Sequence, residues 1–93
     1  MRSIEQARSA LERGEPERAI SYLDAYDRAF PAGAFRQETA VLRVDAYLAR
    51  GDRPAAARAA AAFVRAHADS PYAVRLRPLA AEAERDASTT SVP

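Results

Sequence analysis

The sequence contains no cysteine, no tryptophan, three glycines and one histidine. The absence of cysteine excludes disulfides, thiolate metal sites and a cysteine nucleophile. Three glycines do not provide a glycine-rich loop for phosphate binding. The single histidine, His67, lies near Asp69 without partners at metal-ligand spacing, so we expect it to end or pack a helix. These absences predict no metal site and no bound cofactor.

Strong charge and long apolar runs are also missing. Fourteen basic residues, all arginine, face thirteen acidic ones, for a net charge of +1. This balance gives no large positive field, so we expect no nucleic-acid partner. No run approaches the roughly 18 apolar residues of a membrane span, so we expect no membrane insertion by this chain. The compartment stays open between cytoplasm and periplasm.

What the sequence does contain is helical periodicity. Apolar residues recur at spacings of three and four, and no stretch alternates as a strand would. Glycine and proline divide the pattern into five helices, with breaks near residues 14, 31–33, 51 and 68–70. On the second helix the predicted inner stripe runs from Ala19 to Phe30. The sequence therefore predicts one all-α domain over residues 1–86 and a disordered tail over residues 87–93.

The pattern repeats at an offset of 37 residues. The residues matched by this offset are Leu11 with Leu48, Arg13 with Arg50, Gly14 with Gly51, Glu15 with Asp52, Ala19 with Ala56, Tyr26 with Phe63, Gly33 with Ser70, and Phe35 with Tyr72. A period of about 34 to 40 residues with two helices per period is typical of helical-hairpin solenoids. We therefore expect two antiparallel hairpins and a fifth, capping helix.

Two segments carry a family resemblance. "GEPERAISYLDAYDRAFP" resembles the second half of a tetratricopeptide (TPR) repeat, with Gly14 at the turn, Ala19 at the small position and Pro31 twelve residues later. "AVLRVDAYLARGD" resembles the end of a repeat's first helix, with Tyr47 at its aromatic position. The chain departs from the family pattern at Arg43, Val44 and Ala68, where the family usually has Leu, Gly and Pro.

The resemblance implies a short right-handed TPR-like solenoid that binds proteins and does not catalyse a reaction. More narrowly, the chain is similar to C-terminal or periplasmic helical domains of bacterial envelope proteins, either anti-sigma-factor-like regulators or envelope-assembly proteins. Both relationships imply a protein partner. They leave the identity of that partner open.

In a TPR-like solenoid the first helices of the hairpins line a concave surface. By repeat position, the predicted partner-binding residues are Arg8, Glu12, Glu38, Val41, Asp45, Leu48, Glu82 and Arg85. We hypothesise a groove for a peptide or helix of a partner protein around Val41 and Leu48, framed by opposite charges. A merely solvated face is the alternative reading of the same residues. A second hypothesis is self-association, as the dimerisation domain of a larger envelope regulatory protein.

Other residue groups invite a catalytic or ligand-binding reading. Glu38 and Asp45 are seven residues apart on one helix face and could form a carboxylate pair, but the interleaved Arg36, Arg43 and Arg50 favour a solvated or salt-bridged face. The tyrosines could form a ligand cage, but their positions on the inner stripes favour packing, with an interface role more open for Tyr22. No serine matches a nucleophile motif. The sequence thus predicts no enzyme activity.

The alanine-rich stretch of residues 51–71 is predicted to be the second helix of the second hairpin. Ala56 and Ala60 fall on its inner face, where small side chains allow close approach, and Phe63 supplies bulk. Ala57, Ala61 and Ala62 are predicted to face outward and only to raise helix propensity. On this assignment Ala60→Leu overpacks the hairpin and Ala61→Gln is tolerated.

Overall fold

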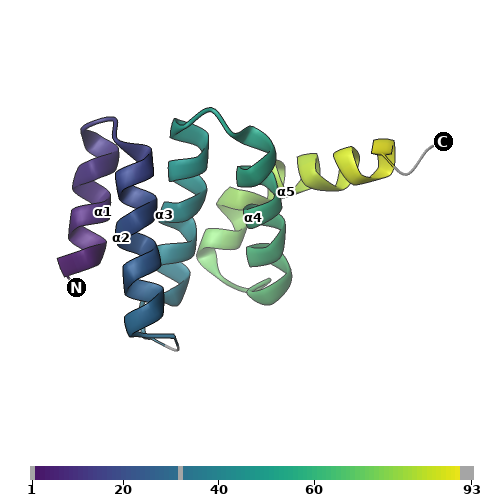
Figure 1. Ribbon diagram of the computed structural model, residues 1–93. Coiled ribbons are helices and arrows are strands. Elements are labelled where there is room, and N and C mark those ends of the chain that lie inside the picture. Colours follow the sequence, from purple (N-terminus) through teal and green to yellow (C-terminus); the bar gives the residue numbers. More distant parts are fainter. Residues whose placement is uncertain (1, 32, 91–93) are drawn as a thin grey trace.

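The chain folds into five consecutive helices (Figure 1). The computed structural model describes residues 2–31 and 33–90, and the side chains of residues 3–31 and 33–85. The helices are α1 (Arg2–Glu12), α2 (Pro16–Ala29), α3 (Arg36–Ala49), α4 (Arg53–Ala66) and α5 (Pro71–Thr90). Each packs against its neighbours in the chain, and no described residue lies in a strand. The predicted all-α, TPR-like arrangement of five helices is confirmed.

The two hairpins turn in the same way. Gly14 and Gly51 have φ of 74° and 83°, which favours glycine because a Cβ disfavours this left-handed region. The amide after each glycine reaches back five residues, from Glu15 to the Ala10 carbonyl at 2.8 Å and from Asp52 to the Tyr47 carbonyl at 2.9 Å. These bonds satisfy carbonyls that the helix end leaves free. The turns are thus equivalent at the 37-residue offset.

The second helices of the hairpins also end alike. The Phe30 amide donates to the Tyr26 carbonyl and the His67 amide to the Phe63 carbonyl, each at 2.8 Å. The ring centroids of Tyr26 and Phe30 are 5.1 Å apart, and those of Phe63 and His67 are 4.9 Å apart. His67 therefore ends α4 and packs on a buried ring, as predicted. The internal repeat read from the sequence is present in the structure.

Two core clusters share α3. The first joins α1, α2 and α3, and its buried residues are Ile4, Ala7, Ala10, Ala19, Leu23, Tyr26, Leu42 and Ala46. The second joins α3, α4 and α5, and its buried residues are Val41, Val44, Ala56, Ala60, Ala61, Phe63, Ala73, Leu76 and Ala80. Successive positions of α3 therefore face opposite hairpins. This central helix couples the two halves of the core.

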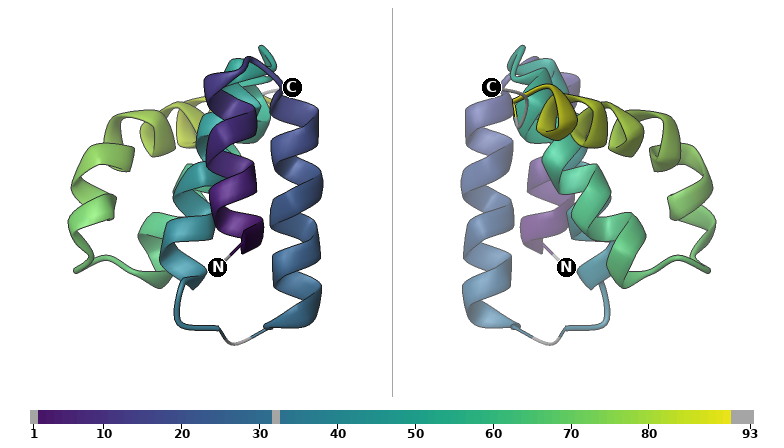
Figure 2. Two further views of the ribbon diagram at one scale, coloured as in Figure 1. Left: turned by 90° about the vertical axis from the view of Figure 1, so that its left-hand side faces the viewer. Right: turned by 90° about the vertical axis from the view of Figure 1, so that its right-hand side faces the viewer.

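The fifth helix is bent. Pro78 lies inside it and lacks an amide to donate to the preceding turn, and in a straight helix its ring would clash with the carbonyl four residues earlier. Figure 2 shows α5 rising along one side of the molecule and then turning across its end. The helix continues to Thr90, past the domain boundary expected at residue 86. Residues 91–93 lie outside the described residues, and disorder of the tail stays a prediction.

Two predictions of side-chain exposure were wrong. Ala57 and Ala61 are buried, at 1% and 7% exposure, because α4 packs against both α3 and α5 and so buries a wider arc than one inner stripe. Ala62 is exposed, as expected. Phe30 was placed on the inner stripe of α2 but is 53% exposed. The helix ends at Ala29 and Phe30 has φ of −136°, so the helical phase no longer applies to it.

Candidate functional site

The first helices of the hairpins and α5 are connected by ion pairs along one face, which we call the α1–α3–α5 face. Arg8 on α1 pairs with Glu38 on α3. Arg75 on α5 donates to Asp45 on α3 at 3.1 Å. The 37-residue offset carries Arg8 onto Asp45 and Glu38 onto Arg75, so the second pair is the first with its charges exchanged. The same inter-helix contact thus recurs with reversed polarity.

A groove lies on this face between α3 and α5, with a volume of about 200 Å³. Its lining residues are Val44, Asp45, Leu48, Arg53, Arg75, Leu76, Pro78, Leu79 and Glu82. The five apolar residues form its walls, and the four charged residues form two ion pairs. Asp45 pairs with Arg75, and Arg53 with Glu82. We call this feature the α3–α5 groove.

The pair of Arg53 and Glu82 joins the start of α4 to α5. The Nε and Nη2 atoms of Arg53 donate to the two carboxylate oxygens of Glu82, each at 2.8 Å. These hydrogen bonds lower the pKa of Glu82 against the opposing effect of desolvation, and the charges of Arg53 and Arg85 lower it further. The same contact raises the pKa of Arg53. The groove is therefore bounded by ion pairs that join α5 to α3 and to the start of α4.

The residues predicted to bind a partner do not all reach this surface. Asp45, Leu48 and Glu82 line the α3–α5 groove, and Leu48 is 38% exposed. Arg8 and Glu38 form the neighbouring pair, while Glu12 and Arg85 are exposed. Val41 is 5% exposed and belongs to the core of the second hairpin, so it cannot frame a groove with Leu48.

Sequence reasoning missed Arg53, Arg75 and Leu79 as groove residues. Arg75 lies 30 residues from its partner Asp45, and Arg53 lies 29 residues from Glu82. Spacing within one helix carries no signal for such contacts, although the 37-residue offset, applied to Glu38, points to Arg75. Glu38 and Asp45 are not a carboxylate pair, because each is paired with an arginine of another helix. The face is salt-bridged, one of the two predicted states, but its partners are Arg8 and Arg75 of other helices and not the interleaved arginines of α3.

A second groove is lined by residues of α2, α3 and α4, and we call it the α2–α4 groove. Its volume is about 530 Å³. Its lining residues are Asp27, Pro31, Arg36, Thr39, Ala40, Arg43, Ala59, Ala62, Phe63, Ala66 and His67. The walls are mainly alanine, whose short side chains leave the space between the helices unfilled. No groove was predicted here from the sequence.

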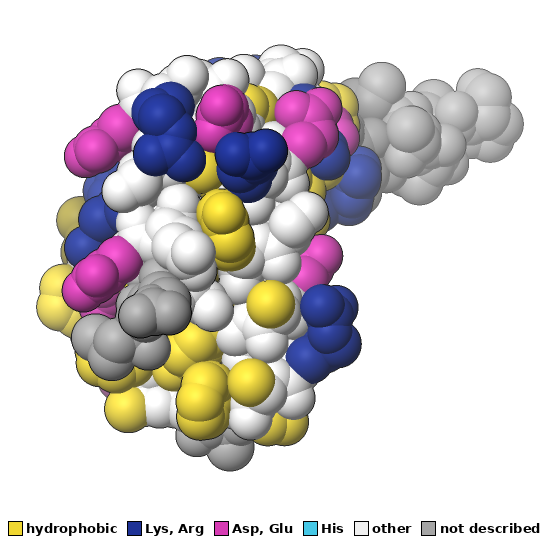
Figure 3. Space-filling model, turned by 60° about the vertical axis from the view of Figure 1, so that its left-hand side comes forward, with side chains coloured by type: hydrophobic (Ala, Val, Ile, Leu, Met, Phe, Trp, Pro, Cys, Tyr) yellow, Lys and Arg dark blue, Asp and Glu magenta, His cyan; other side chains and the backbone are white. Residues whose placement is uncertain are grey.

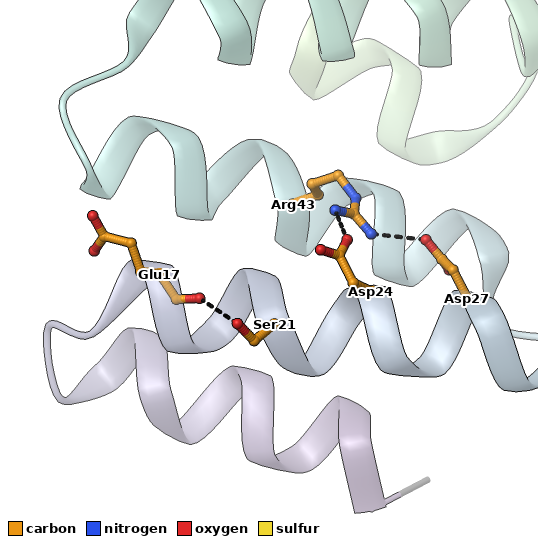
Figure 4. A network of polar contacts seen from close by, with 5 residues as sticks. All are labelled: Glu17, Ser21, Asp24, Asp27 and Arg43. Carbon is orange, nitrogen blue, oxygen red and sulfur yellow. Dashed lines mark hydrogen bonds and ion pairs between the residues drawn. The ribbon is translucent and has the colours of Figure 1, made fainter.

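Arg43 connects α3 to α2 at the edge of this groove (Figure 4). Its two Nη atoms donate to Asp24 and Asp27, each at 2.7 Å, and its side chain is 20% exposed. Partial burial lowers the pKa of Arg43, but the hydrogen bond with Asp24 and the charges of both aspartates outweigh this and raise it. Arg43 thus joins the two hairpins at a position where the TPR pattern has leucine.

The tyrosines do not converge on one cavity. Tyr26 is 4% exposed and packs in the first core cluster, as predicted. Tyr22 packs against the same cluster, and Tyr47 and Tyr72 against the other, all three partly exposed. Arg50 lies over the Tyr47 ring at 5.1 Å from its centroid. Packing, the favoured interpretation, accounts for these contacts.

Exposed side chains separate by type along one face of the molecule. Figure 3 shows charged side chains near the α1–α2 turn and hydrophobic ones toward the α2–α3 connection. The charged end includes the pair of Arg13 and Glu15, at 3.2 Å. Phe30 is exposed at the other end, beside Pro31, which lines the α2–α4 groove. The α2–α4 groove therefore opens next to an apolar end of the molecule.

Two further observations concern the described part of the chain. Over residues 2–31 and 33–90, no helix combines the length and the apolar character needed to cross a membrane. Within the same ranges, no three acidic or histidine side chains gather as metal ligands would.

The family model described as "YfiO: Outer membrane lipoprotein" matches residues 2–90, which span all five helices. The chain matches no curated protein and no solved structure. The family match covers nearly the whole chain and agrees with the predicted similarity to envelope-assembly proteins.

Proposed function

The chain belongs to the YfiO family of outer membrane lipoproteins, and from this premise we propose that it binds a peptide or helix of a partner protein in the α3–α5 groove. The family implies protein–protein interaction in outer membrane assembly and is non-enzymatic. Its outer membrane setting is compatible with the periplasmic option of the two compartments left open by the sequence. We accordingly propose that this chain is a non-catalytic interaction module.

The observation that carries the proposal is the composition of the α3–α5 groove. Leu48 and Leu79 offer apolar surface that remains accessible, since Leu48 is exposed and Leu79 half-buried. The ion pairs of Asp45 with Arg75 and of Arg53 with Glu82 hold their charges at the rim. An apolar centre with a polar rim is the usual anatomy of a protein interface. Arg8 and Glu38 extend this surface toward α1.

The test compares two exposed apolar residues. Leu48 lines the groove, whereas Val74, which is 65% exposed on α5, lines neither groove. An affinity-tagged chain captures partners from an envelope extract, cross-linking identifies the contacting protein, and the purified partner is titrated against Leu48→Glu and Val74→Glu. We expect Leu48→Glu to weaken binding about tenfold or more, and Val74→Glu to leave it unchanged. Equal effects of the two substitutions would exclude the α3–α5 groove as the binding surface.

Self-association remains the second prediction from the sequence. Light scattering over a concentration series separates it from partner binding. A monomer at all concentrations would remove it, whereas a dimer disrupted by substitutions on α1 or α5 would support it.

A further inference from the structure

The α2–α4 groove is not used by the proposed function, although it is larger than the α3–α5 groove. Its walls are formed by Ala59, Ala62 and Ala66 of α4, which face Ala40 of α3. The ring of Phe63, itself buried, also lines it. This is an apolar recess between two helices, of the kind into which the side chains of a third helix insert.

The lining of this recess carries two arginines, Arg36 and Arg43, and one acidic residue, Asp27. Its one acidic lining residue, Asp27, accepts a hydrogen bond from Arg43, and Asp24 accepts the other. Arg36 and His67 also line the groove, and within the described part of the chain Arg36 has no carboxylate partner. The acidic side chains are therefore engaged while basic groups remain available.

The exposed face of α4 adds to this charge. Arg58 and Arg65 lie four residues before and three residues after Ala62, so all three fall on one side of the helix. Both arginines are exposed, and neither pairs with an acidic group among the residues that the structure describes. The sequence of α4, RPAAARAAAAFVRA, contains no acidic residue. Arginines thus flank the alanine wall on its solvent side.

We propose that the α2–α4 groove is a second docking site, which takes an acidic amphipathic helix of a partner protein. An apolar side chain of that helix enters the recess between Ala62 and Phe63, and its carboxylates face Arg58, Arg65 and Arg36. Charge complementarity selects an acidic partner, and the alanine walls select a large apolar side chain. The α2–α4 groove and the α3–α5 groove share no lining residue, so the two partners can bind at the same time.

The test uses a synthetic probe and does not require the natural partner. The probe is a fluorescein-labelled helical peptide with leucines at i, i+3, i+4 and i+7 and glutamates at the flanking positions; a matched peptide has lysine in place of each glutamate. Fluorescence anisotropy measures binding of both to the full chain. We expect the acidic peptide to bind at least about tenfold more tightly, with a preference that shrinks as salt is added.

Two pairs of variants locate the site. Ala62→Phe fills the recess and should weaken binding of the acidic peptide about tenfold, whereas Ala49→Phe, at an exposed alanine that lines neither groove, should not change it. Arg65→Glu should weaken binding of the acidic peptide several-fold, because it reverses a charge at the rim of the site. Arg18→Glu makes the same change in net charge on α2 and should have a smaller effect. Circular dichroism checks that each variant keeps its helix content and melting temperature.

Several results would overturn the proposal. They are absence of measurable binding by the acidic peptide, equal binding of the acidic and basic peptides, and equal effects of Ala62→Phe and Ala49→Phe. Vesicles containing anionic lipid serve as a further comparison. If they compete with the peptide and bind Ala62→Phe as well as the unmodified chain, the surface is a nonspecific basic patch. Leu48→Glu should leave binding of the acidic peptide unchanged, so failure here is distinguishable from failure of the α3–α5 groove.

Discussion

Arg75 on α5 donates to Asp45 on α3 at 3.1 Å, in the position that Glu38 and Arg8 occupy one repeat earlier with opposite charges. The two ion pairs occupy equivalent positions in the repeat, but the acidic and basic residues are exchanged between the helices. Because both orders of charge occur in one fold, the backbone accommodates either residue on either helix. The polarity of the second pair should therefore be exchangeable.

A charge swap tests this relationship. Asp45→Arg or Arg75→Asp alone places like charges across the α3–α5 contact and should lower the free energy of unfolding by about 0.2 to 1 kcal/mol, since the pair is partly exposed. The double variant should regain most of that loss. Urea denaturation of the four proteins gives the coupling energy. A double variant as unstable as the sum of the single ones would contradict exchangeability.

Arg43 should contribute more than the surface pairs. Arg43→Leu restores the usual TPR residue but removes two charge-assisted hydrogen bonds from Asp24 and Asp27. We expect a loss of about 1 to 3 kcal/mol in the free energy of unfolding. The stability of Arg43→Lys should fall between those of the unmodified protein and Arg43→Leu, because an ammonium group cannot reproduce the fork that reaches both aspartates. Chemical denaturation measures the free energy of unfolding of the unmodified protein and of both Arg43 variants. Arg13→Leu, which removes an exposed ion pair, is the control. A loss no larger than in the control would show that the contact is only superficial.

The alanines of α4 should differ sharply from one position to the next. Ala61 is 7% exposed and Ala62 is exposed, so Ala61→Gln should destabilise the protein, by about 1 to 3 kcal/mol, and Ala62→Gln should be tolerated. Phe63→Ala should cost about 3 to 5 kcal/mol because it leaves a cavity in the second core cluster. Ala60→Leu should also overpack the helix interface, since Ala60 is fully buried. Thermal unfolding ranks these variants, and equal stability of the Ala61 and Ala62 variants would contradict the observed phase of α4.

The titration of Glu82 should depend on Arg53. The hydrogen bonds from Arg53 lower the pKa of Glu82 in the folded protein, so the pair stabilises the fold above the pKa that Glu82 has when unfolded. This stabilisation is lost as the pH falls through the folded pKa. NMR titration of the Glu82 side-chain carbonyl should give a midpoint below the ordinary glutamate value, and Arg53→Gln should raise it. Arg77→Gln, a loss of charge elsewhere on α5, serves as the control; the same midpoint in all three proteins would argue against the pair.

The helices and their order were predictable because their causes are local. Gly14 and Gly51 end helices in a conformation that favours glycine, and Pro16 and Pro71 begin them, so these residues act within a few positions of themselves. The 37-residue repeat was visible for the same reason, since equivalent turns require equivalent residues. Even the contact between Phe63 and His67 follows from a spacing of four on one helix.

The surfaces were less predictable, because exposure depends on how many neighbours a helix has. Val41 was expected on the binding face, yet α3 lies between two core clusters and buries it. Ala57 and Ala61 were expected to face solvent, yet α4 packs against both α3 and α5, and the two alanines are buried. The period of the apolar residues identifies one buried stripe of a helix. It cannot show that a second neighbouring helix buries another stripe.

The sequence by itself determined the helices, their turns, the repeat and the kinship to a family of envelope proteins. Those features rest on backbone conformation and on periodicity within about ten residues. Only the tertiary structure decided which arginine meets which carboxylate and where the two grooves lie. Arg43 meets Asp24, and Arg75 meets Asp45, because packing brings residues 19 and 30 positions apart to within hydrogen-bonding distance. Such contacts depend on the stacking of whole helices, which the apolar period within a single helix does not encode.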